Sequence, residues 1–140
     1  MKSSKFLAGG IIAAVIYFLL SYLLYGVLFK SFFDQNGMVA DMSKFTWWAM
    51  ILSTVAAGFL IAYVLSVARA TTMGKGFAIG LIVGLLMELS IDLGMYGMGQ
   101  SMMDSSAIGV DVVITAILSG VAGAVVGMVY GTGKKETAAA

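Results

Sequence analysis

The stretch from Gly76 to Gly99 reads GFAIGLIVGLLMELSIDLGMYGMG and decides the fold class. It is longer than the roughly 20 apolar residues with which an α-helix crosses a hydrocarbon core of about 30 Å. Three more stretches of the same kind run over residues 6–29, 45–68 and 108–130. Only helices and closed barrels satisfy their backbone in lipid, and the alternating pattern of a barrel strand is absent. The sequence therefore predicts an all-α fold: a four-transmembrane-helix bundle, forming one domain over 1–140 with a short tail at 132–140.

The composition supports this class and excludes others. The chain is 61% hydrophobic and 11% charged, against about 25% charged residues in ordinary globular domains. A net charge of +1 argues against a nucleic-acid partner, which needs a concentrated basic face. The chain has no Cys and no His, and it contains neither a P-loop nor a nucleophile beside a histidine base. We therefore expect a protein that is not an enzyme, has no cofactor and lacks a resident metal.

The basic residues predict the orientation, because Lys and Arg concentrate in the cytoplasmic loops of membrane proteins. Of the eight, Lys30 and Lys44 lie in the first connection. The other six fall together on the opposite side of the membrane: Lys2, Lys5, Arg69, Lys75, Lys134 and Lys135. The first apolar run exceeds the roughly 7–15 residues of a signal-peptide core, so we expect it to be retained. The sequence thus predicts a multi-pass protein of the inner (cytoplasmic) membrane with both termini in the cytoplasm.

The two halves of the chain resemble each other weakly. The first and third stretches share some positions, and so do the second and fourth. The matches are Gly9/Gly80, Tyr25-Gly26/Tyr96-Gly97, and the pattern Leu-Ser-x-Val-Ala at 52–56 and 118–122. Two helical hairpins repeated in parallel would explain them. Chance agreement between apolar sequences is the alternative.

Glycines recur at every fourth position in the third and fourth stretches. They are Gly76, Gly80 and Gly84, followed by Gly123, Gly127 and Gly131. Small residues at this spacing let helix backbones approach closely in lipid, where apolar burial alone does not drive association. We expect these residues to be helix-packing positions, facing each other or a second subunit. The sequence therefore favours a homo-oligomer or a larger membrane complex.

Acidic residues within the apolar stretches are the strongest functional signal. Glu88 and Asp92 lie four residues apart, hence on one helix face, about 18 and 24 Å along the axis from Gly76. Asp111 is expected to start the fourth helix at nearly the same depth. An unpaired carboxylate in lipid costs several kcal/mol, so it must face a wet cavity, bind a cation or stay protonated. Asp92 and Asp111 reaching the outer headgroups is the alternative.

Two hydroxyl residues extend this possible cation or proton site. Tyr17 and Ser21 occupy the positions in the first half that match Glu88 and Asp92 in the second half. If the halves pack about a pseudo-twofold axis, these hydroxyls come near the acids. Tyr25 adds hydrogen-bonding capacity, although an interfacial position explains it equally well.

Methionines crowd the far end of the third stretch, at positions Met95, Met98, Met102 and Met103. Thioethers are soft ligands that suit copper(I). Methionine also fills irregular packing in flexible apolar helices. Since no other residue points to copper, packing is the favoured interpretation.

The segment from Phe18 to Phe29, FLLSYLLYGVLF, resembles the first helix of a bacterial family of small four-helix membrane proteins, domain of unknown function 1761. That helix ends in an aromatic-Tyr-x-x-Leu-Phe pattern. The final stretch is similar in placing Asp111 at its start and glycines near its end. Leu24 stands where the family usually has Trp, and its usual Pro is missing. The resemblance implies a four-helix fold and no known activity.

Two functions follow from these observations. The first is a structural or accessory subunit packed against itself or partner membrane proteins, which small size and glycine spacing favour. The second is a small proton- or cation-coupled transporter or channel that uses Glu88 and Asp92.

Overall fold

The computed structural model describes residues 3–36, 44, 46–100 and 103–132, and these are helical with no strand. The elements are α1 (Ser3–Leu23), the π-helix η1 (Leu24–Leu28), α2 (Lys30–Gln35), α3 (Trp47–Val67), α4 (Met73–Gly97) and α5 (Ser105–Gly131). The predicted all-α bundle is confirmed. Lys2, Met102, Lys134, Lys135 and the tail beyond 132 lie outside the described residues.

Four helices are long and apolar enough to cross a membrane: Ser3–Leu28, Trp47–Val67, Met73–Gly97 and Ser105–Gly131. This indicates a multi-pass membrane protein. Helices α1, α4 and α5 each begin three residues before the predicted start, at Ser3, Met73 and Ser105. At α5 the Asp104 carboxylate accepts the Ala107 N–H at 2.8 Å and caps the helix. Asp111 was predicted to start this helix, but it lies in the second turn.

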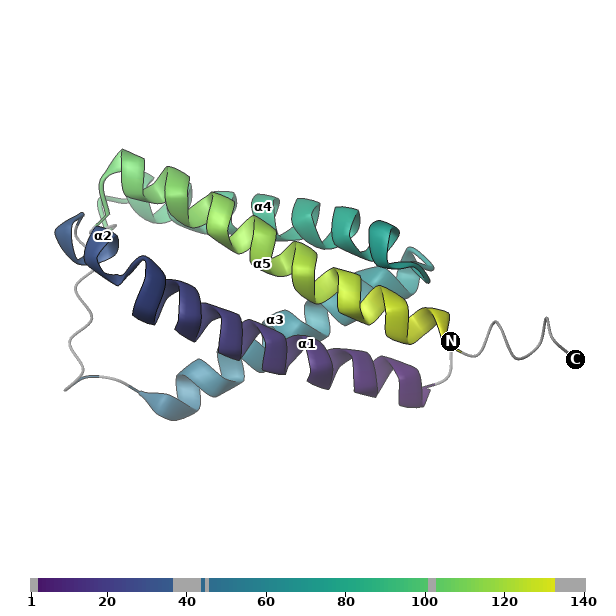
Figure 1. The fold of residues 1–140 in the computed structure, drawn as a ribbon. Helices are drawn as coiled ribbons and strands as arrows, with labels where there is room; N and C mark the ends of the chain where they lie inside the picture. Colours follow the sequence, from purple (N-terminus) through teal and green to yellow (C-terminus); the bar gives the residue numbers. More distant parts are fainter. Residues whose placement is uncertain (1–2, 37–43, 45, 101–102, 133–140) are drawn as a thin grey trace, which may run out of the picture.

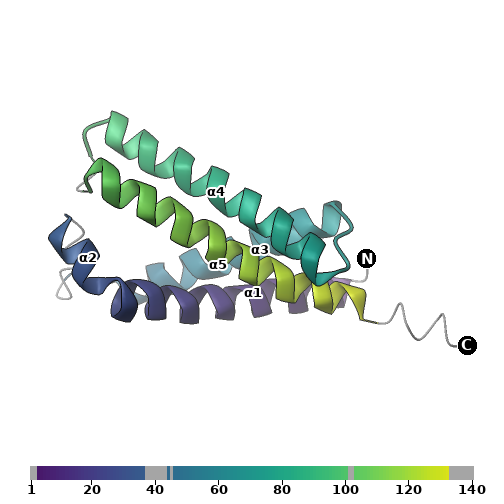
Figure 2. The same ribbon diagram turned by 45° about the horizontal axis from the view of Figure 1, so that its top comes forward.

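The helices pack as two hairpins, α1 with α3 and α4 with α5, and α5 joins them. In α5, 56% of the span is buried inside the bundle, against 11–22% in the other three. Figures 1 and 2 both show α4 and α5 side by side, while α3 crosses α1 at an angle in Figure 1. We call the end that holds α2 and the α4–α5 connection the loop end, and the opposite end the base. A parallel repeat of the hairpins stays a prediction.

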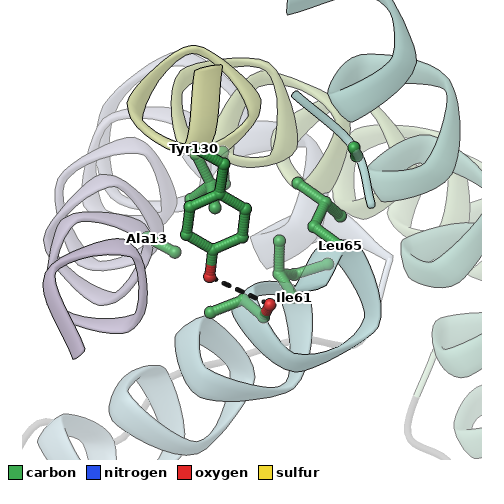
Figure 3. Packing of buried hydrophobic residues seen from close by; sticks show 8 residues of the cluster. Ala13, Ile61, Leu65 and Tyr130 are labelled. Atoms are coloured by element: carbon green, nitrogen blue, oxygen red, sulfur yellow. Dashed lines mark hydrogen bonds between the residues drawn. The ribbon is translucent and has the colours of Figure 1, made fainter. Parts of the chain in front are cut away.

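The core lies where α1, α3 and α5 meet. Ala13, Ile61, Leu65 and Tyr130 are buried against one another there (Figure 3). The Tyr130 hydroxyl donates to the backbone carbonyl of Ala62 at 3.0 Å, which satisfies the one polar atom of this side chain in an apolar setting. This contact fixes the end of α5 that is nearer the base against the last two turns of α3.

Helices α3 and α4 end in the same hydrogen-bond pattern. After α4, the N–H of Gly99 bonds to Tyr96 and that of Gln100 bonds to Met95, with Gly99 at φ +69°. After α3 the same pattern places Arg69 at φ 51°. This Schellman ending favours glycine, because a Cβ atom is disfavoured at positive φ. Arg69 thus occupies a position normally given to glycine.

Close backbone contact joins α4 and α5 along the half nearer the base. A Cβ atom on Gly76 would collide with the Gly123 carbonyl oxygen, and one on Gly80 would collide with that of Ser119. A Cβ atom on Gly84 would collide with the Ser119 hydroxyl, and on Gly127 and Gly131 it would collide with carbonyl oxygens just before α4. The predicted glycine positions therefore lie at this helix contact within one chain.

Candidate functional site

Polar residues continue the two glycine rows toward the loop end. On α4 the spacing of four runs from Gly76 through Gly84 to Glu88 and Asp92. On α5 the same spacing runs back from Gly123 to three polar residues, Ser119, Thr115 and Asp111. Because the helices are antiparallel and packed along these rows, the polar half of one faces the polar half of the other.

Three carboxyl groups converge at this level. One oxygen each from Glu88, Asp92 and Asp111 lies within 4.8 Å of the others. Asp92 and Asp111 are 5% and 4% exposed, while Glu88 is half-buried. The two aspartates therefore point into the bundle, and the alternative in which they reach the headgroups does not match their burial.

Asp111 accepts a hydrogen bond from a residue outside the α4–α5 pair. The Tyr25 hydroxyl donates to its Oδ1. That leaves the Thr115 hydroxyl as donor to the Tyr25 oxygen, at 3.0 Å. Asp92 Oδ2 is buried and finds no hydrogen-bond partner among the described residues.

The π-helical segment η1 carries Tyr25 to this site. A π-helix adds a residue to the turn and so changes which face the following side chains occupy. The Tyr25 ring packs on Phe33 of α2, with ring centroids 5.2 Å apart, and Phe33 is itself 2% exposed. The short helix α2 thus supports the ring of Tyr25 from outside the four spans.

A second hydrogen bond lies one helical turn further into the bundle. The hydroxyls of Tyr17 and Ser119 are bonded to each other, and Ser119 is fully buried. Gly84 makes room for this pair, because a Cβ atom there would collide with the Ser119 hydroxyl. Beyond this level toward the base, the α4–α5 contact is formed by glycines.

Three of the described lysines have partners away from the cluster. Lys30 forms an ion pair with Asp34 at 2.6 Å. Lys5 and Lys75 donate to backbone carbonyls at the base.

The structure brings together most of the predicted site residues. Glu88, Asp92 and Asp111 form the cluster, and Tyr17 lies one turn away through Ser119. Ser21 is half-buried and makes no side-chain hydrogen bond within the described ranges.

Sequence reasoning did not assign Thr115 and Ser119 to the site and left Tyr25 undecided. The spacing of four from Asp111 was the available signal for the first two. Of the methionines proposed for packing, Met95 on α4 and Met98 directly after α4 are exposed.

Comparison with protein-family models, with curated proteins and with solved structures finds no match for this chain. The resemblance of the first helix to a four-helix family therefore stays a prediction.

Proposed function

We propose that this protein is a small multi-pass membrane protein that binds a proton or a cation between α4 and α5 and couples it to transport. One observation carries the proposal: three carboxyl groups from two helices converge within 4.8 Å inside the apolar bundle. Each ionised carboxylate at the centre of a span costs about 2.5–3.5 kcal/mol on insertion scales. A chain that only needed packing would gain nothing from three of them.

The proposed orientation places the base in the cytoplasm and the cluster toward the external side. The six-to-two division of the basic residues supports it. The close glycine contact between α4 and α5 occupies the cytoplasmic half in this orientation, so access to the acids is from the loop end. Reporter fusions after Asn36 and Ser105 should be external and one after Ala140 cytoplasmic. A cytoplasmic reporter at Asn36 would reverse the orientation.

Thermal unfolding in mild detergent tests the binding function. Glu88→Gln keeps the shape of the side chain but removes its charge. We expect the melting temperature of the wild type to depend on pH between 5 and 9 or on added cations, because anything that binds the folded state alone stabilises it. Glu88→Gln should lose most of that dependence. Identical responses of the two proteins to pH, sodium, potassium and divalent cations would reject the proposal.

A structural or accessory subunit is the second candidate. The observation in its favour is that α4 packs almost entirely on α5 and leaves a row of exposed apolar side chains. These are Ile82, Leu86, Leu89 and Leu93. Lipid would cover this row equally well, and a second copy or a partner helix would cover it specifically. Native mass measurement after purification in mild detergent separates them: a defined stoichiometric partner supports the subunit role, and a monomer rejects it.

A further inference from the structure

We infer that the ligand of the carboxyl cluster is a divalent cation of about the size of calcium. The inference rests on the proposed function and narrows it to one class of ligand. Besides the cluster itself, its support is Asp92 Oδ2, which belongs to a side chain 5% exposed and has no hydrogen-bond partner among the described residues. A buried carboxylate oxygen without a donor is unusual in a folded protein. A bound cation would satisfy it.

The chemistry of the donors selects the kind of ion. Every polar atom at the cluster is an oxygen, supplied by the three carboxyl groups and by the hydroxyls of Tyr25 and Thr115. Carboxylate and hydroxyl oxygens suit hard cations, whereas copper and zinc sites generally use sulfur or nitrogen. The chain has no Cys and no His to supply either from a thiolate or an imidazole.

The spacing of the oxygens fits the size of the ion. Calcium binds oxygen at about 2.3–2.6 Å, so two of its ligands can lie up to roughly 5 Å apart. The three carboxylate oxygens already lie within 4.8 Å of one another. Magnesium needs near-ideal octahedral geometry at about 2.0–2.1 Å and gives up water reluctantly. We therefore expect calcium to bind more tightly than magnesium.

Tyr25 acts as a positioning residue in this site. Its hydroxyl donates to Asp111 Oδ1, and its ring is held by Phe33 of α2. Partners that orient a metal ligand from outside the coordination shell commonly affect affinity by about 10–100-fold. Tyr25→Phe keeps the ring and its packing and removes only the hydrogen bond, so it should weaken calcium binding without a comparable loss of stability.

The test is thermal unfolding and calorimetric titration of the full chain in detergent, with calcium chloride, magnesium chloride and sodium chloride at matched ionic strength. Calcium should raise the melting temperature of the wild type more than magnesium does, and sodium should have little effect. Asp92→Asn should abolish the rise. Asp104→Asn makes the same substitution at an exposed helix cap outside the cluster, and it should retain the rise.

Terbium, a luminescent ion of calcium's size, provides a readout if Asp92→Asn fails to fold. Excitation of tyrosine should sensitise bound terbium in the wild type, calcium should displace it, and Tyr25→Phe should reduce the signal. Failure of calcium to act beyond sodium, or a full calcium response in Asp92→Asn, overturns the divalent ion. If a pH or sodium response that depends on Glu88 persists in that case, the proposed function stands. The absence of every such response rejects both.

Discussion

Replacing Gly80 by alanine tests whether the α4–α5 contact holds the bundle together. The added Cβ atom would collide with the Ser119 carbonyl oxygen and would lie 3.0 Å from the carbonyl carbon and 3.2 Å from Gly123 Cα. Unstrained carbon contacts are about 3.5–4.0 Å. All three neighbours are backbone atoms, which cannot rotate away. The helices must therefore separate by several tenths of an ångström.

The magnitude follows from two opposing effects. Overpacking costs about 1–3 kcal/mol, and rigid backbone neighbours place Gly80→Ala at the upper end of that range. Alanine regains about 0.8–1.0 kcal/mol through its higher helix propensity. The net expectation is a loss of about 2 kcal/mol in the free energy of unfolding.

Gly94→Ala is the matched control on the same helix. No atom lies within 4 Å of the position where its Cβ would stand, so only the propensity gain of up to about 1 kcal/mol remains. Reversible unfolding in mixed detergent micelles measures both variants. We expect Gly80→Ala to lower the free energy of unfolding and Gly94→Ala to raise it. A Gly80→Ala protein as stable as Gly94→Ala would refute the close backbone contact.

Two further predictions concern helix ends. Arg69→Gly should raise the free energy of unfolding by about 1 kcal/mol, because Arg69 adopts φ 51° and the left-handed conformation penalises a Cβ atom; equal or lower stability on chemical unfolding would contradict this. At α5, hydrogen bonds from the Ala107 N–H and the Ser106 hydroxyl lower the pKa of Asp104 below its usual value. A lowered folded pKa stabilises the fold at neutral pH, and this stabilisation is lost as pH falls through it. Asp104→Ala should therefore lower the melting temperature at pH 7 but not in acid. Asp104→Asn should remain near wild type, because asparagine also caps helices. If Asp104→Ala lowers the melting temperature equally at every pH, the cap is contradicted.

The spans and the α4–α5 contact could be predicted because their signals are periodic. Apolar runs long enough for a bilayer are visible in the sequence, and glycines at every fourth position mark one helix face. The same periodicity places Glu88 and Asp92 on the face of α4 that carries the glycines. The contact between α1 and α3 was harder to predict from the sequence. There a Cβ atom on Gly58 would collide with the backbone of Ala14 and lie 2.8 Å from the Gly10 carbonyl oxygen. Small residues recur every fourth position around it, at Thr54, Gly58 and Ala62, but only one of them is a glycine.

The composition of the site depended on structure that spacing alone does not define. Tyr25 reaches Asp111 from a π-helical segment, whose wider turn shifts the faces that an ideal helix would present. The depth of Asp111 depends on where α5 begins, and the Asp104 cap places that start earlier than the apolar pattern does. Ser21, inferred from the repeat, does not join the cluster. Local irregularities at helix ends thus account for what the sequence pattern missed.

A double-mutant cycle between Asp92 and Asp111 tests whether the carboxyl groups of α4 and α5 form one interacting unit. The free energy of unfolding is measured for the wild type, Asp92→Asn, Asp111→Asn and the double variant under the same detergent and pH. Residues in direct contact show coupling of about 0.5–3 kcal/mol, whereas separate residues add within about 0.3–0.5 kcal/mol. We expect a coupling of about 0.5–3 kcal/mol between Asp92 and Asp111. The effects of Asp92→Asn and Asp104→Asn should be additive, which provides the control. Additive effects of Asp92→Asn and Asp111→Asn would contradict this coupling.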